Sequence, residues 1–113
     1  MAIMGLDPAS GPPFAVIVVP GHPTTVVVKG ELDLATAPEL AQRLEELAAT
    51  GQREVTVDLS GLEFLDSQGI HVLLQARETL RSQGGGLKVR SPQPLVARVL
   101  ETTGLLELLT EGE

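Results

Sequence analysis

Short β-branched segments alternate along this chain with longer segments in which leucine recurs at helical spacing. The first two β-branched segments, residues 14–19 and 24–29, are separated by the turn-forming tetrad Pro20-Gly21-His22-Pro23. This pair predicts an antiparallel hairpin, and residues 30–33 close its second strand. Few folds accept a hairpin followed by such alternation, so the order of the segments limits the chain to a small group of architectures.

The first predicted helix begins at Thr36-Ala37-Pro38-Glu39, which has the form of a capping box with proline in the first turn. Leucines follow at helical spacing until the helix ends near Gly51. Residues 54–59 alternate polar and apolar side chains, which predicts a strand that the chain leaves at Ser60-Gly61. We expect a short buried connector after it, formed by Leu62, Phe64 and Leu65.

The second predicted helix begins within residues 66–69 and ends at Gly84-Gly85-Gly86. A short strand over residues 87–90 follows. Residues 91–94, with two prolines, start a third helix, which Gly104 stops in a left-handed conformation. The expected apolar face of this helix consists of Leu95, Val96, Val99 and Leu100.

The predicted order of elements is ββαβαβα. Strands that are joined by helical crossovers of this length run parallel to one another. We therefore expect an α/β fold: a mixed β-sheet, made of an N-terminal hairpin plus parallel strands, with helices packed on it. Residues 1–13, which are rich in Gly and Pro, are expected to be a flexible N-terminal leader, and the rest of the chain to be one domain.

Charge and composition argue against several functions. The chain of 113 residues has 15 acidic and 8 basic side chains, a net charge of −7, so it lacks the excess of cations that binds nucleic acid or anionic membranes. It has no cysteine and only two histidines, His22 and His71, so no metal site is expected. No signal peptide or membrane-spanning segment is recognisable, which makes the cytoplasm the expected location.

Asp66, Ser67, Gln68 and Gly69 form the most suggestive polar cluster, because they lie between the end of a strand and the first turn of a helix. The backbone N–H groups at such a helix start lack intrahelical partners. With Asp66 as the N-cap, we expect the amides of the next three residues to point outward and to form an anion site. The simpler interpretation is that Asp66 or Ser67 is merely a helix cap, since such residues are the commonest at that position.

Ser67-Gln68-Gly69 also half-matches the nucleophile elbow of α/β-hydrolases, although Leu65 stands where that motif has its first glycine. His71 lies on the same helix as the serine, and His22 precedes it, so neither histidine has the place of the catalytic base in that fold. A small serine hydrolase is therefore a remote alternative.

Two pairs of carboxylates are candidates for acid–base catalysis or for binding a divalent cation. Glu31 and Asp33 flank Leu32 and are expected to share a face, and Asp58 is expected near Asp66. No third oxygen-rich segment accompanies either pair, so the favoured interpretation is a solvated end of the sheet.

Four segments together carry a resemblance to a known family: Gly30-Glu31-Leu32-Asp33, residues 57–69, Gly84-Gly85-Gly86 and Thr103-Gly104-Leu105. Over about residues 14–110 the chain resembles the STAS domains, and among them the small bacterial anti-anti-sigma factors, also called anti-sigma factor antagonists. Residues 14–113 would then be a single STAS domain.

The resemblance implies a regulatory protein that is not an enzyme and that binds an anti-sigma factor with serine kinase activity, thereby freeing a sigma factor. That kinase would phosphorylate Ser67 and switch the protein off. It would use its own ATP and Mg²⁺, so no cofactor is expected on this chain. A serine phosphatase is a further candidate partner. The expected partner-binding residues are Glu31, Asp33, Asp66, Gln68 and Gly69.

Two residues depart from the family pattern, which usually has Ser or Thr where Gln68 stands and a small residue where His71 stands. This departure affects which kinase would phosphorylate Ser67 and how efficient that phosphorylation would be. The alternative is a STAS interaction module of another type, stressosome-like or transporter-associated, in which Ser67 is not phosphorylated.

Overall fold

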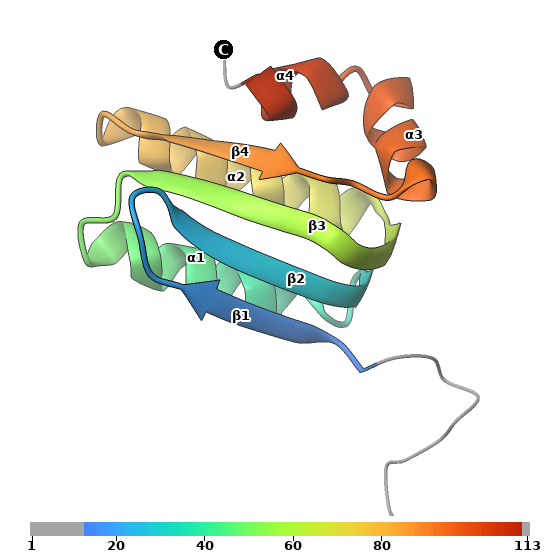
Figure 1. Ribbon diagram of the computed structural model, residues 1–113, viewed down its shortest axis with the longest axis horizontal. Coiled ribbons are helices and arrows are strands. Elements are labelled where there is room, and N and C mark those ends of the chain that lie inside the picture. Colours follow the sequence, from blue (N-terminus) through green and yellow to red (C-terminus); the bar gives the residue numbers. More distant parts are fainter. Residues whose placement is uncertain (1–12, 112–113) are drawn as a thin grey trace, which may run out of the picture.

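The β-branched segments pair into one four-stranded sheet whose order follows the chain, β1-β2-β3-β4. The computed structural model describes residues 13–111. β1 pairs antiparallel with β2, whereas β3 pairs parallel with β2 and with β4 (Figure 1). The predicted hairpin and the mixed sheet are confirmed, while the predicted leader, residues 1–13, lies outside the described residues except for Pro13. The strands are β1 (Ala15–Val19), β2 (Thr24–Leu32), β3 (Glu54–Leu65) and β4 (Gly86–Arg90).

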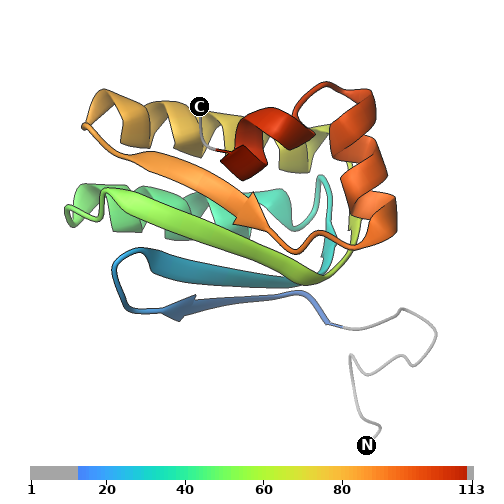
Figure 2. The same ribbon diagram turned by 45° about the horizontal axis from the view of Figure 1, so that its top comes forward.

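Two long helices cover one face of the sheet. α1 (Ala37–Ala49) and α2 (Ser67–Ser82) contact each other and lie on the same side of the strands (Figures 1 and 2). α3 (Pro94–Thr102) follows β4 at one end of the sheet, and α4 (Leu106–Glu111) packs beside β4. The described part of the chain therefore has the predicted order of elements with one short helix added.

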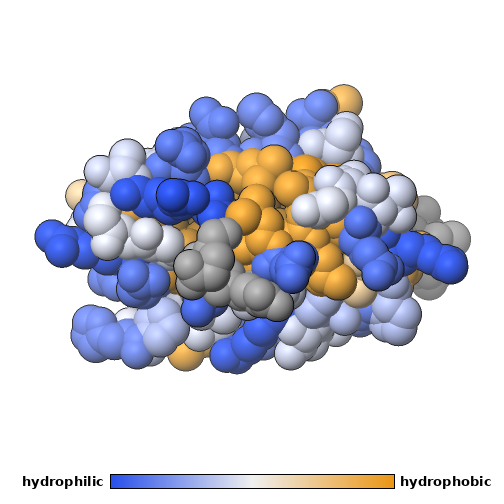
Figure 3. All heavy atoms as spheres, turned by 90° about the horizontal axis from the view of Figure 1, so that it is seen from above, coloured by the Kyte–Doolittle hydropathy of each residue, from blue (hydrophilic) through white to orange (hydrophobic). Residues whose placement is uncertain are grey.

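The sequence pattern does not predict α4, because a helix of 6 residues is too short to display a helical period. Tertiary packing supports it instead, since its Leu109 has no exposed surface. Figure 3 looks onto the side of the molecule where α4 lies, and it shows apolar side chains at the middle of that face with polar ones around them.

The core lies between the sheet and the pair α1 and α2. Alternate strand residues face it, and Val26, Val28 and Val57 have no exposed surface. The buried positions on α1 and α2 include leucines at helical spacing. Aliphatic side chains supply this core, each contributing about 1.5–3 kcal/mol when fully buried.

The predicted end of the third strand is wrong. β3 continues to Leu65, whereas the sequence predicted that the chain leaves the sheet at Ser60-Gly61. β2 extends beside it, and Leu32 pairs with Leu65 beyond two irregularities of the register. A Cβ on Gly61 would lie 2.9 Å from Cγ of Lys29, so glycine permits the close approach there. Phe64, expected to be buried, is 42% exposed, because Leu62 and Leu65 of the same strand occupy the core positions.

The predicted capping box at α1 is also wrong, because Thr36 makes no side-chain cap hydrogen bond. Its hydroxyl donates to the carbonyl of Glu31 at 2.7 Å and accepts the backbone N–H of Asp33 at 2.9 Å. The Asp33 carboxylate accepts the backbone N–H groups of Ala35 and Thr36 at 3.0 and 3.2 Å. An aspartate turn therefore holds the loop between β2 and α1.

The apolar face predicted for the third helix is partly wrong. Val96 and Leu100 are fully buried, but Leu95 is 56% exposed. Consecutive residues of a helix point about 100° apart, so Leu95 lies off the buried stripe. The predicted stop at Gly104 is confirmed by its φ of 77°.

Gly85→Ala is expected to destabilise the fold by about 1–3 kcal/mol through overpacking. A Cβ here would overlap the backbone carbonyl of Arg53, the group that also accepts the N–H of Gly86 at 2.9 Å. Urea unfolding followed by circular dichroism measures the change. Gly86→Ala is the matched control, because its nearest heavy atom would lie 3.6 Å away, and equal effects of the two substitutions would contradict the close approach.

Candidate functional site

Ser67 is exposed and is the first residue of α2, directly after the end of β3. Asp66 precedes it as the N-cap, with an extended backbone and a carboxylate that accepts the N–H groups of Gln68 and Gly69 at 2.9 and 3.2 Å. The N–H of Asp66 in turn donates to the carbonyl of Leu32 at the end of β2, at 3.2 Å. The serine hydroxyl is thus held at the junction of β2, β3 and α2.

The prediction that outward-pointing amide groups at the start of α2 form an anion site is wrong. Two of the three expected donors, the N–H groups of Gln68 and Gly69, are already bound to the Asp66 carboxylate. That carboxylate also places negative charge at the positive end of the α2 dipole, where an external anion would lie. The predicted cap is therefore confirmed.

Gly69 is buried under the ends of two strands. A Cβ on it would come within 2.5 Å of Cδ1 of Leu65 and 2.8 Å of the side chain of Leu32. The first turn of α2 can therefore lie directly on β2 and β3, which fixes the position of Ser67. The structure gives Gly69 a packing role, and its contribution to partner binding remains a prediction.

The two acidic residues at the end of β2 have different surroundings. Glu31 is exposed and pairs with Phe64 across the strands. Asp33 is half-buried, and its carboxylate is engaged by the backbone of the loop that follows β2. Glu31 can meet a partner directly, whereas Asp33 holds the shape of its loop.

Three exposed apolar side chains lie near the same end of the sheet. The sequence pattern did not identify them as one surface. Leu34 follows β2 and is 71% exposed, Phe64 near the end of β3 is 42% exposed, and Leu95 at the start of α3 is 56% exposed. Leu34 and Phe64 are at the carboxyl ends of the parallel strands β2 and β3, and Leu95 is on α3, which follows β4. These ends of β2 and β3, α3 and the start of α2 lie at the same end of the sheet (Figure 1). Exposed apolar residues gathered beside polar ones are typical of a protein-binding surface.

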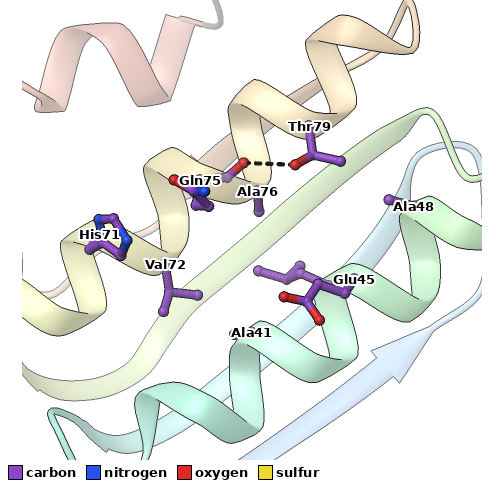
Figure 4. Close-up of a pocket in the computed structure, with 9 residues that line it drawn as sticks. Ala41, Glu45, Ala48, His71, Val72, Gln75, Ala76 and Thr79 are labelled. Atoms are coloured by element: carbon purple, nitrogen blue, oxygen red, sulfur yellow. Dashed lines mark hydrogen bonds between the residues drawn. The ribbon is translucent and has the colours of Figure 1, made fainter.

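A groove of about 370 Å³ lies between α1 and α2 (Figure 4). It begins at His71, one turn beyond Ser67, and Leu44, Val72 and Ala76 are among its apolar lining residues. His71 is exposed. Thr79 donates its hydroxyl to the carbonyl of Gln75 at 3.1 Å. The groove brings no second histidine or serine to His71.

The histidines do not form a catalytic group with Ser67. His22 lies in the turn before β2, whose first residue pairs with Val55 near the start of β3. Ser67 follows the other end of β3, so His22 and Ser67 are at opposite ends of the sheet. His71 shares the helix of Ser67. This arrangement does not provide the nucleophile and base geometry of a serine hydrolase.

Asp58 does not pair with Asp66 but binds the guanidinium of Arg90 on β4, at 3.3 Å. The backbone N–H of Ser60 donates to it at 2.9 Å. This hydrogen bond is the main reason that the pKa of Asp58 is lowered, with Arg90 as a smaller cause and burial acting in the opposite direction. Within residues 13–111, no three histidine or acidic side chains gather closely enough to hold a metal ion, and no helix is both long and apolar enough to cross a membrane.

The chain matches the family described as Mlab, STAS domain, over residues 17–110. It is 31% identical over 88 residues to the anti-sigma-B factor antagonist of Staphylococcus aureus, covering 78% of this chain and 82% of that protein. The crystal structure of an anti-sigma factor antagonist from Mycobacterium paratuberculosis is similar with a TM-score of 0.76 and 33% identity, over 85% of this chain and 83% of that one.

The anti-sigma factor antagonist SpoIIAA shares the fold in both of its forms. The unphosphorylated form matches with a TM-score of 0.72 and 22% identity, over 83% of each chain. The phosphorylated form from Bacillus matches with a TM-score of 0.68 and 20% identity, over 87% of this chain and 88% of that one.

Asp58→Asn is expected to lower the free energy of unfolding by about 0.5–1 kcal/mol at pH 7. Because the folded-state pKa of Asp58 lies below the unfolded value of about 3.9, its contribution is present above that value and is lost as the pH falls through the folded-state pKa. Urea unfolding of both proteins between pH 7 and pH 2.5 measures the difference, which should shrink toward acid. A difference that does not change with pH would contradict the role of the Asp58 charge.

Proposed function

This chain belongs to the STAS domain family, and on that premise we propose that it is an anti-sigma factor antagonist: it binds an anti-sigma factor that is a serine kinase, releases the sigma factor, and is switched off by phosphorylation of Ser67. The observation that carries the proposal is the position of Ser67, an exposed hydroxyl at the start of α2. The curated relative in Staphylococcus aureus is named as an anti-sigma-B factor antagonist, which supports the same role.

The surface around Ser67 supports protein binding. Its apolar part is formed by Leu34, Phe64 and Leu95, and its polar part by Glu31 and Gln68, all of them exposed. An apolar centre with a polar rim is the usual composition of a protein interface. We call these five residues, with Ser67, the Ser67 surface.

Phosphorylation of Ser67 is expected to change the interface more than the fold. A phosphoryl group brings about 1.5–2 negative charges to the N-terminus of α2, where the helix dipole is worth about 0.3–1 kcal/mol. The carboxylate of Asp66 already binds the N–H groups of Gln68 and Gly69, and its negative charge offsets part of this gain. The net change in folding free energy is therefore small.

Phosphorylation of Ser67 is therefore expected to act by weakening the binding of the partner. A dianion placed against apolar side chains such as Leu34 and Phe64, or against a surface with no matching cation, loses its hydration without compensation. A cost of about 3 kcal/mol corresponds to a loss of about a hundredfold in affinity. The chain contributes only the serine hydroxyl to the transfer, and ATP and Mg²⁺ belong to the partner kinase.

Incubation with candidate anti-sigma kinases and ATP, followed by mass spectrometry, is expected to find phosphate on Ser67. Ser67→Asp should bind the kinase at least about a hundredfold more weakly than wild type, measured by calorimetry. Ser82→Asp adds the same charge at the other end of α2 and is the control, with unchanged affinity expected. Phosphate on another residue, or wild-type affinity of Ser67→Asp, would reject the proposal and favour a STAS module in which Ser67 is not modified.

Leu95→Ala is expected to weaken binding of the same partner by about five- to thirtyfold without loss of fold stability, because the side chain is exposed in the free protein. Ile17→Ala is the control: Ile17 is 44% exposed but lies on β1, away from the Ser67 surface. Calorimetry gives the affinities and thermal unfolding the stabilities. Equal weakening by the two substitutions would mean that Leu95 is outside the interface.

A further inference from the structure

β1 is an edge strand, and its own sequence does not protect its open side. Within residues 13–111, β1 pairs with β2 alone. Its residues, Ala15–Val19, are all apolar, and the strand contains no charged side chain, no proline and no bulge. Charges, prolines and bulges are the usual means by which edge strands avoid pairing with other chains. The open side of β1 is therefore competent to accept a further strand.

The backbone groups at the open side of β1 belong to Val16 and Val18. In an antiparallel pair, alternate residues direct both their N–H and their C=O toward the partner strand, and the others direct both away from it. Arg43 on α1 donates to the carbonyl of Val16 at 3.4 Å, which indicates that Val16, and with it Val18, faces away from β2. This long hydrogen bond leaves the carbonyl a second lone pair. Val16 and Val18 therefore each offer an N–H and a C=O to a further strand.

The exposed side chains of β1 lie on the face of the sheet opposite α1 and α2. Val16 is buried toward these helices, whereas Ile17 and Val19 are 44% and 46% exposed. Figure 1 looks onto this outer face, and no helix crosses it in front of β1 and β2. Ile17 pairs with the half-buried Val27 of β2, so their side chains are neighbours in one row across the strands. This apolar row ends at the open edge.

We propose that a second copy of this chain pairs with the open side of β1, so that the two sheets join edge to edge. A two-fold axis at Ile17 makes the two β1 strands antiparallel, with Val16 of each copy opposite Val18 of the other. These opposed residues then exchange their N–H and C=O groups on both sides of the axis. Ile17 meets its own equivalent in a non-hydrogen-bonded pair, with Cβ atoms about 4.5–5.5 Å apart.

The side chains suit this pairing. The row formed by Val27 and Ile17 continues across the axis into the same row of the second copy, and the small side chain of Ala15 lies opposite Val19. Because β1 has no charged side chain, the two strands bring no like charges together, although each chain has a net charge of −7.

The size of the interface sets the expected strength of the dimer. Pairing along a strand of 5 residues buries much less surface than the roughly 1,600 Å² of a standard stable complex. We therefore expect a reversible dimer with a dissociation constant of about 0.1–1 mM. The proposal does not depend on the proposed function, because β1 contains none of the residues of the Ser67 surface.

The amide spectrum of the ¹⁵N-labelled full chain tests the pairing at concentrations from about 0.02 to 2 mM, which bracket the expected dissociation constant. Saturable shifts are expected at Val16, Ile17 and Val18. The amide protons of Val16 and Val18 should also exchange more slowly at high concentration, because pairing gives them acceptors. Sedimentation equilibrium over the same range should show the mass of a dimer. A chain that stays monomeric throughout, or shifts that spare β1, would overturn the proposal.

A charge exchange at Ile17 tests the two-fold axis. Ile17→Lys and Ile17→Glu each place like charges opposite one another and should weaken self-association at least about tenfold. An equal mixture of the two variants places opposite charges together and should associate at least about fivefold more tightly than either alone. The side chain is exposed, and the amide spectrum of each variant checks that it is folded.

Thr102→Lys is the matched control, because it adds a positive charge at an exposed position of α3, which packs against β3 and α4. Unchanged self-association is expected. Weakening equal to that of Ile17→Lys, or a mixture of the two Ile17 variants that associates no better than either alone, would overturn the proposal.

Discussion

The parallel pairing of β2 with β3 is the constraint on which the rest of the structure depends. The two strands remain paired to their last residues, Leu32 and Leu65, despite two irregularities of register. Both helices of the main layer start just beyond these ends, and the N–H of Asp66 donates to the carbonyl of Leu32. Strand pairing thus brings the loop before α1 and the start of α2 to one place. The position of Ser67 follows from it.

Packing and capping then fix the first turn of α2 independently of any ligand. Gly69 allows the helix to lie on Leu32 and Leu65, and the carboxylate of Asp66 satisfies the amide groups that a helix start leaves free. A site organised in this way does not need an anion for its stability. The proposed phosphorylation of the neighbouring serine would therefore leave the fold unchanged.

The two ends of the sheet have different chemistry. At the carboxyl ends of the parallel strands, exposed apolar side chains such as Phe64 lie beside Ser67 and Glu31. At the opposite end, Arg81 and Lys88 stand close to the buried Arg77. Since α2 spans the distance between them, these two groups of side chains lie at opposite ends of one helix. The net charge of −7 conceals this division, because it averages over the whole surface.

The sequence by itself determined the hairpin, the crossovers, the helix cap at Asp66 and the family, because these depend on local periodicity, turn residues and contiguous motifs. It did not predict the length of β3 or the exposure of Phe64, since strand length here depends on pairing with β2. Nor did it predict that the Asp66 carboxylate fills the amide site, or that cations from α2 and β4 share a hollow. Only the tertiary structure decided these features, because each depends on the distance between groups that lie on different elements or that compete for the same donors.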